Sequence, residues 1–140
     1  MTSQKPVQVS VSGLSARAGL LIACALSLTG CGEKLVTVQG TVLQNQQPLT
    51  MSPTGSIQVT LIPDVPPGTP YTTYPGRADA TGKFVIEEKV KPGKYKVAVE
   101  QNDPLPGTDK LMGKFSPQNT TIVREVVDEK TPLVIDLAMP

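Results

Sequence analysis

Short runs in which hydrophobic and polar residues alternate are the main pattern from residue 35 to the C-terminus. Between residues 35 and 43, Val36, Val38 and Val42 share one phase, and Thr37, Gln39 and Thr41 lie on the other. A period of two places successive side chains on opposite faces of a β-strand, so this segment is predicted to be a strand with one buried face. Similar runs lie at residues 56–61, 83–87, 94–100, 120–127 and 133–138, with a weaker one at 71–78.

Segments rich in proline and glycine separate these runs. The most proline-rich lies at residues 63–70, where prolines lack the N–H donors that a central strand needs. A second loop is predicted from residue 102 to residue 119. About seven short strands divided by turns are typical of a sandwich, in which two sheets bury their apolar faces against each other. We therefore predict an all-β fold, a single antiparallel β-sandwich of about seven strands at residues 35–140.

The chain before residue 31 has a different pattern. Lys5 and Arg17 are the only charged residues of its polar first part, and residues 19–28 are uncharged and mostly apolar. A membrane-spanning helix needs roughly 20 apolar residues, so this shorter run fits the hydrophobic region of a signal peptide. The run leads into the tetrad Leu28-Thr29-Gly30-Cys31.

This tetrad resembles the lipobox of bacterial lipoproteins: an aliphatic residue, two small residues and a cysteine. The resemblance implies that residues 1–30 are a removable signal peptide, that Cys31 is lipidated, and that residues 31–34 form a short tether. The implied location is the bacterial cell envelope, with the domain anchored to the inner or outer membrane on its periplasmic or external side. The alternatives are a cytosolic N-terminal helix and an ordinary secretory signal with an incidental cysteine.

Composition argues against several classes of function. The chain has 13 Lys and Arg residues against 12 Asp and Glu, a net charge of +1, so we expect no nucleic-acid partner. It has no histidine, which excludes histidine zinc sites and Ser-His-Asp or Cys-His catalysis. If Cys24 leaves with the signal peptide and Cys31 is acylated, the mature chain forms no internal disulfide. We expect no cofactor, no bound metal and no enzymatic activity.

Four short motifs occur in an order that resembles a known family. They are Val38-Gln39-Gly40-Thr41-Val42, Pro48-Leu49, Asp79-Ala80-Thr81-Gly82-Lys83-Phe84 and Pro92-Gly93-Lys94-Tyr95-Lys96-Val97. The order is similar to that of the carboxypeptidase regulatory-like, or transthyretin-like, domain in small lipoproteins of planctomycete-type bacteria. Asn45-Gln46-Gln47 departs from the Asp-Gly that the family usually has before the proline. These are turn and core motifs, so the resemblance implies a fold and leaves the activity open.

The motif residues are predicted to have structural roles. Gly82 suits a tight turn with positive φ, and Asp79 is expected to accept hydrogen bonds from backbone amides ahead of it. The alternative for Asp79 is a calcium site with Glu87 or Glu88, although Ca²⁺ takes about six to eight oxygen ligands and no loop is that rich in them. The predicted turn and core residues are Gly40, Asp79, Gly82, Phe84, Pro92, Gly93 and Tyr95.

Two surface features have more than one interpretation. The four lysines between residues 89 and 96 are interpreted as a solvated strand face, with contact to anionic lipid or cell-wall polymer as the alternative. Tyr71 and Tyr74, beside the proline loop, are interpreted as packing residues. Their alternative role is stacking on a sugar or on a partner's proline.

These expectations lead to a prediction of function. The sequence predicts a non-catalytic, membrane-anchored envelope lipoprotein whose β-domain has a structural role or binds an envelope protein or polymer. The alternative is an accessory subunit of an envelope enzyme or of a transport or secretion complex. The sequence does not name the ligand.

Overall fold

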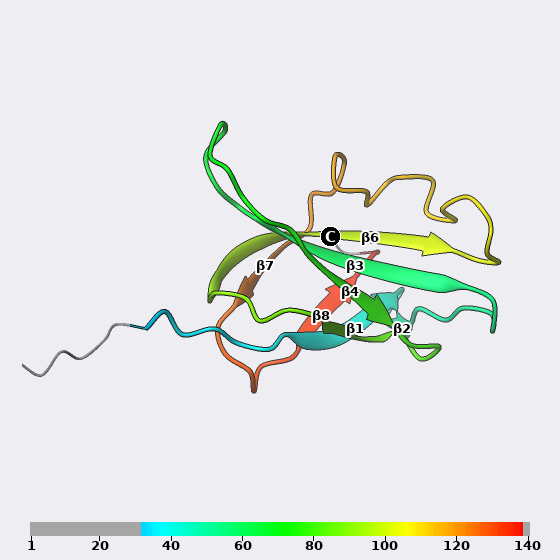
Figure 1. Cartoon of the computed structure of the whole chain (residues 1–140). Coiled ribbons are helices and arrows are strands. Elements are labelled where there is room, and N and C mark those ends of the chain that lie inside the picture. The colour runs from blue at the N-terminus through cyan, green and yellow to red at the C-terminus, as the bar shows by residue number, and fades with distance from the viewer. Residues whose placement is uncertain (1–31, 139–140) are drawn as a thin grey trace, which may run out of the picture. The chain divides into compact units, whose positions relative to one another are not determined.

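The computed structural model describes residues 32–138. The predicted signal peptide, the tetrad Leu28-Thr29-Gly30-Cys31 and the lipidation of Cys31 lie outside the described residues. No helix in the described part of the chain is long and apolar enough to cross a membrane. Eight strands form the regular structure (Figure 1): β1 (Gln39–Gln44), β2 (Gln47–Pro48), β3 (Ser56–Pro63), β4 (Tyr74–Ala78), β5 (Lys83–Ile86), β6 (Gly93–Asn102), β7 (Val123–Val126) and β8 (Leu133–Asp136).

All eight strands belong to one sheet. Its order is β2-β1-β5-β4-β3-β6-β7, and β8 also pairs with β1. Every pairing is antiparallel except that of β1 with β8, which is parallel from Gly40↔Leu133 to Leu43↔Asp136. The sheet is strongly curled, so that it wraps around its own core as a half-barrel (Figure 1).

The predicted all-β, largely antiparallel class is therefore confirmed, whereas the predicted two-sheet sandwich is replaced by this single curled sheet. The reason is that β4 pairs with both β5 and β3, which joins the two groups of strands that a sandwich would separate. The Arg124 side chain of β7 also reaches β8, where its Nε donates to the Val134 carbonyl at 3.0 Å. The curl thus brings the two outer strands of the sheet within reach of one side chain.

The alternation in the sequence sets the inner face of the sheet. Val36, Val38 and Val42 are buried, as their shared phase predicts. The most extensive pairing joins β3 to β6 from Ser56↔Asn102 to Pro63↔Tyr95, so it forms the centre of the fold. Fully buried side chains from six different strands or adjoining segments meet inside the curl: Ile57, Leu61, Phe84, Ile86, Val90, Val97, Ile122 and Ile135.

The turn between β1 and β2 explains how the chain accommodates its departure from Asp-Gly. Asn45 and Gln46 both have positive φ, at 53° and 63°. A two-residue hairpin turn of this kind favours Asn followed by Gly, so the Gln46 backbone is strained. The backbone N–H of Gln46 donates to Oδ2 of the buried Asp136 at 3.0 Å. This hydrogen bond from β8 holds the turn in place.

A long loop between β3 and β4 projects from the sheet (Figure 1). We call residues 64–73 the proline arm, and every one of them is exposed. At its base the Asp64 N–H donates to the Lys94 carbonyl at 3.1 Å. Near its tip the Thr69 N–H donates to the Pro66 carbonyl at 3.1 Å. The strand predicted at residues 71–78 therefore begins only at Tyr74, where the arm rejoins the sheet.

Candidate functional site

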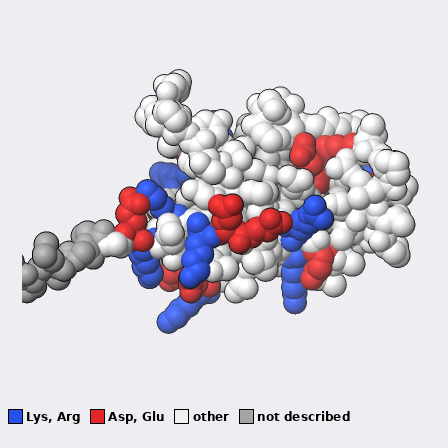
Figure 2. All heavy atoms as spheres, in the orientation of Figure 1, with Lys and Arg blue, Asp and Glu red and all other residues white. Residues whose placement is uncertain are grey.

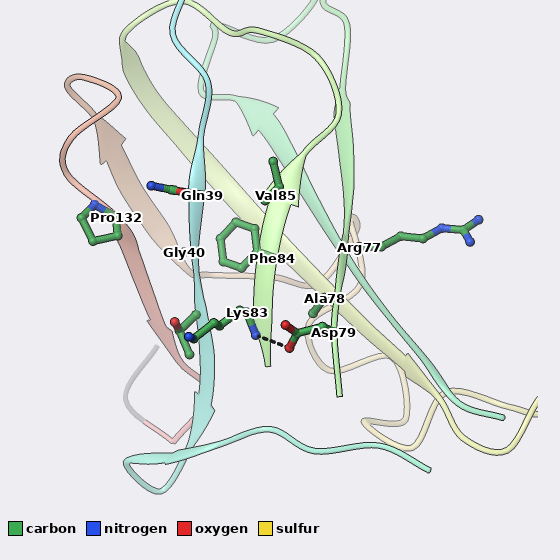
Figure 3. Close-up of a pocket in the computed structure, with 10 residues that line it drawn as sticks. Gln39, Gly40, Arg77, Ala78, Asp79, Lys83, Phe84, Val85 and Pro132 are labelled. Carbon is green, nitrogen blue, oxygen red and sulfur yellow. Dashed lines mark hydrogen bonds between the residues drawn. The ribbon is translucent and has the colours of Figure 1, made fainter. Parts of the chain in front are cut away.

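The larger of the two hollows described on the domain, which we call the outer hollow, has a volume of about 660 Å³. It spans β1, β5 and the end of β4, and Pro132 closes it on the side of β8 (Figure 3). The residues that line it are Gln39, Gly40, Thr41, Arg77, Ala78, Asp79, Lys83, Phe84, Val85 and Pro132.

Gly40 and Phe84 explain the packing at the floor of the outer hollow. A Cβ at Gly40 would lie 2.1 Å from the Leu133 carbonyl oxygen and 2.7 Å from the Phe84 ring, so only glycine allows β8 and Phe84 to approach β1 this closely. The Phe84 ring is 1% exposed, whereas Val85, next in sequence and on the opposite face, is 51% exposed. The exposed apolar surface of the outer hollow is therefore formed by Val85 and Pro132, and the Phe84 ring belongs to the core.

The rim of the outer hollow contains Asp79, which is committed to its own turn. Its Oδ1 accepts hydrogen bonds from the Thr81 N–H at 2.7 Å, the Thr81 hydroxyl at 2.6 Å and the Lys83 N–H at 3.1 Å. These hydrogen bonds, that from the Thr81 hydroxyl first, lower the pKa of the Asp79 carboxyl. Asp79 thus caps the β4–β5 turn, with the dashed line to Lys83 marking one contact in Figure 3.

Gly82 completes this turn. Its φ is +78°, and a Cβ there would lie 2.8 Å from the Val42 carbonyl oxygen. Both the backbone conformation and the lack of space therefore require glycine. Glu87 and Glu88 follow β5 at its other end and are not brought to Asp79. No group of three or more His, Cys, Asp or Glu side chains that could hold a metal ion is present in residues 32–138.

The Pro92-Gly93 turn positions Tyr95 at the start of β6. Tyr95 is 4% exposed, and its hydroxyl donates to the Lys91 carbonyl at 2.7 Å. Burial raises the pKa of this phenol. The ring of Tyr74 packs edge-on against that of Tyr95, with 6.2 Å between centroids. Tyr74 is thus a packing residue, whereas Tyr71 on the proline arm is 57% exposed and available for contact.

The lysines of residues 89–96 do not form a uniform cationic surface. Lys91 pairs with Glu33 at 2.6 Å, and this hydrogen-bonded ion pair raises the Lys91 pKa. Lys94 and Lys96 are exposed on β6, opposite the buried Tyr95 and Val97. Figure 2 shows basic and acidic side chains side by side on the face in view, which suits a solvated surface.

Two loop carboxylates, the buried Asp103 and the half-buried Asp109, were not singled out from the sequence. Asp103 accepts hydrogen bonds from the Ser52 hydroxyl, the Ser52 N–H at 3.0 Å and Lys110 Nζ at 3.1 Å. The hydrogen bond from the Ser52 hydroxyl is the first cause of its lowered pKa. Asp109 accepts from the N–H groups of Gln101, Leu111 and Gly113 at 2.8–3.0 Å. Both carboxylates organise the loop after β6. Asp103 could not be found by local pattern because Ser52 lies 51 residues away in sequence. Asp109 accepts from residues two and four positions ahead, the same spacing as in the Asp79 turn, and that local signal was available.

A second, smaller hollow was also missed. It has a volume of about 430 Å³, and we call it the amide hollow because side-chain amides dominate its lining. The run Gln44-Asn45-Gln46-Gln47 is the signal that the sequence offers, although its last three residues were considered only as a departure from Asp-Gly. The lining residues are Gln44, Asn45, Gln47, Pro48, Leu49, Thr50 and Gln101.

Comparison with known proteins adds no relative from which a site could be transferred. No protein-family model, curated protein or solved structure matches the chain. The resemblance to carboxypeptidase regulatory-like domains stays a prediction from motifs, while the structure establishes an all-β, largely antiparallel domain of eight strands. The function is therefore argued from the chain's own geometry.

Proposed function

We propose that the protein is a non-catalytic lipoprotein of the bacterial envelope, anchored to a membrane through Cys31, whose β-domain is a binding module. The observation that carries this proposal is the position of the lipobox-like tetrad. Residues 32–35 are exposed, and the fold begins at the fully buried Val36, which exchanges backbone hydrogen bonds of 2.8 and 2.9 Å with Val90. The tetrad therefore ends only a few residues before the folded domain, as expected of an anchor and its tether.

The family proposed for the domain is the carboxypeptidase regulatory-like, or transthyretin-like, family. Its support is that two motif glycines stand where only glycine fits: Gly40 under the close approach of β8 and Gly82 at a positive φ. The motif aromatics Phe84 and Tyr95 are both buried. The motifs thus coincide with positions at which the fold itself constrains the residue.

A binding role suits the outer hollow better than a catalytic one. Its one carboxylate, Asp79, already accepts three hydrogen bonds from its own turn. The exposed Val85 and the cation of Lys83 offer contact surface, while Arg77 extends away from the other lining residues in Figure 3. Such a surface favours contact with a partner over proton transfer or nucleophilic attack.

The proline arm favours a second candidate, an accessory subunit of an envelope complex. Pro66, Pro67 and Pro70 restrict the backbone of the arm, and Tyr71 is exposed beside them. Proline-rich segments bind aromatic-lined grooves at a low entropy cost because they are already extended. Beyond Asp64 the arm has no charged residue, and it forms the white projection in Figure 2.

Metabolic labelling with a radioactive fatty acid in a lipoprotein-processing bacterium tests the anchor. We expect wild type and the control Cys24→Ser to carry label and to partition into detergent. Cys31→Ser should carry none and keep its signal peptide, because only that thiol is positioned as the lipid acceptor. A single acyl chain binds membranes marginally whereas two or more hold firmly, so mass spectrometry should find a multiply acylated Cys31 at the mature N-terminus. Unlabelled wild type would contradict the proposal.

A further inference from the structure

The amide hollow is formed by segments that are distant in sequence. Gln44 ends β1, Asn45 lies in the turn, Gln47 belongs to β2, and Thr50 follows shortly after. Gln101 comes from the far end of β6. No residue that lines the hollow carries a charge, and its polar groups are amides and one hydroxyl.

Gln101 is the buried polar residue of this hollow, and hydrogen bonds hold it in place. It is 6% exposed and follows the buried Tyr95, Val97 and Val99 on the inner face of β6, a position at which an apolar residue is expected. Its backbone N–H donates to Asp109 Oδ1 at 2.8 Å, and its carbonyl accepts from the Lys110 N–H at 2.7 Å. Its side-chain Nε2 donates to the Thr50 carbonyl at 3.0 Å. Both ends of the residue are therefore fixed.

The side-chain oxygen of Gln101, Oε1, is available to accept a hydrogen bond. No hydrogen bond among the described residues uses Oε1, yet no buried side-chain nitrogen or oxygen in that part of the chain lacks a partner. Oε1 is therefore not sealed in the core, and Gln101 lines the hollow. Burying an amide is unfavourable unless its groups are hydrogen-bonded, so an amide held in this way presents an acceptor to whatever fills the hollow.

We propose that the amide hollow binds a segment of a neutral glycan. Side-chain amides both donate and accept, as do sugar hydroxyls, and an uncharged lining gives no advantage to an ionic ligand. The alternative, a peptide added along β2, is disfavoured because this strand has only two residues and one is Pro48, which has no N–H.

The inference deepens the proposed function by naming the class of polymer, and it rests on that function only for the direction in which the hollow faces. β1 leads from the end of the sheet where the segment before it, residues 32–38, enters to the end where β2 lies (Figure 1), and β2 contributes to the lining of the hollow. A domain tethered through Cys31 would therefore carry the hollow on the end away from its tether.

Saturation-transfer difference NMR tests the site, using the intact protein in a detergent without a sugar headgroup. The probes are triacetylchitotriose and cellotriose, each at up to about 10 mM, because an exposed site without aromatic stacking is expected to bind in the millimolar range. Wild type should transfer saturation to one or both trisaccharides. Gln101→Met keeps the side-chain length and removes the amide, and should weaken binding roughly three- to tenfold, the effect of losing one hydrogen bond.

Two further variants keep the test independent of folding. The exposed pair Gln44→Ala/Gln47→Ala should also lose binding while its thermal unfolding matches wild type. Gln58→Ala removes an exposed amide of β3 outside the hollow and should bind like wild type. Equal weakening by Gln58→Ala, or no transfer from wild type to either sugar, would overturn the inference.

A peptide probe and the fatty-acid label distinguish a glycan site from a peptide site and from the anchor. Triglycine, which has amides but no hydroxyls, should show no transfer, and binding equal to that of the trisaccharides would overturn the glycan assignment in favour of peptide. Failure to bind sugar in a protein whose Cys31 carries fatty acid would overturn this inference and leave the anchor proposal intact. Sugar binding by a protein without label would do the reverse.

Discussion

Strand β3, at the centre of the sheet, and the proline arm that directly follows it in the chain differ in almost every physical respect. Ile57, Val59 and Leu61 of β3 are all 0% exposed, with β4 on one side and β6 on the other. From Asp64 onward, immediately after β3 ends, ten successive residues up to Thr73 are exposed. Figure 1 shows the arm leaving the sheet at this point.

The difference shows that two distinct physical effects determine the conformation of the sheet and of the arm. In the sheet, cross-strand hydrogen bonds and burial of the inner face fix each residue. In the arm, prolines reduce the number of conformations available to the chain, so the segment needs few contacts to keep its conformation. We therefore expect substitutions of buried residues in the sheet to lower stability strongly, and substitutions in the arm to act mainly on recognition.

The largest contrast is expected between two aromatic residues. Phe84→Ala removes a core ring that is 1% exposed and should lower the free energy of unfolding by about 3–5 kcal/mol. Tyr71→Ala in the arm, and Lys83→Ala beside Phe84, should each cost under about 0.5 kcal/mol. Urea denaturation followed by circular dichroism measures all three. Comparable costs for Phe84 and Tyr71 would remove the distinction between the regions.

A second contrast compares two glycines with nearly equal positive φ. Gly82 has φ +78° and close backbone neighbours, whereas Gly68, at φ +84° in the arm, has nothing within 4 Å of an added Cβ. Gly68→Ala should cost only the conformational strain, about 1 kcal/mol, and Gly82→Ala about 2 kcal/mol or more because strain and overlap add. Thermal unfolding separates the two variants. Equal melting temperatures would show that the β4–β5 turn relaxes freely.

Removing the arm should change the free energy of unfolding less than Phe84→Ala or Gly82→Ala does. The register Leu61↔Tyr74 places Pro63 opposite residue 72, so residues 64–71 can be replaced by the two-residue turn Asn-Gly. The free energy of unfolding is expected to change by no more than about 1 kcal/mol, because loop-closure entropy varies slowly with loop length. Guanidinium denaturation checks this, with an unchanged m-value as evidence that the sheet is intact. A loss of several kcal/mol would assign the arm a structural role.

The smallest effect is expected from Asp79 and depends on pH. Because its pKa is lowered in the folded protein, Asp79 stabilises the fold at pH values above its unfolded pKa, and this contribution is lost as pH falls through the folded pKa. Below about pH 4, wild type should therefore lose more stability than Asp79→Asn does. Thermal melts in an acid series measure the difference. Asp64→Asn in the arm controls for the loss of one surface charge, and parallel profiles for all three proteins would contradict the prediction.

Local pattern predicted seven of the eight strands, all but the two-residue β2, and with them the inward phase and the principal turns. The alternation at residues 35–43 and 133–138 predicted the burial of Val36, Val42 and Ile135, and Asp79 with Gly82 indicated the β4–β5 turn. These features depend on residues within a few positions of one another, because side chains alternate along any extended strand. The lipobox-like tetrad is equally local, and it remains a prediction.

Tertiary structure decided how the strands join and which polar residues converge. The single sheet depends on β4 pairing with both β3 and β5, and the place of β8 depends on its parallel pairing with β1. The amide hollow depends on Gln101 reaching Thr50. Asp136 is also buried, where it supports the strained Gln46 from the other end of the chain. Alternation of hydrophobic and polar residues predicts which face of the sheet a side chain lies on, but it does not predict which strand lies beside it. That choice follows from the curvature of the whole sheet and from hydrogen bonds between residues far apart in sequence.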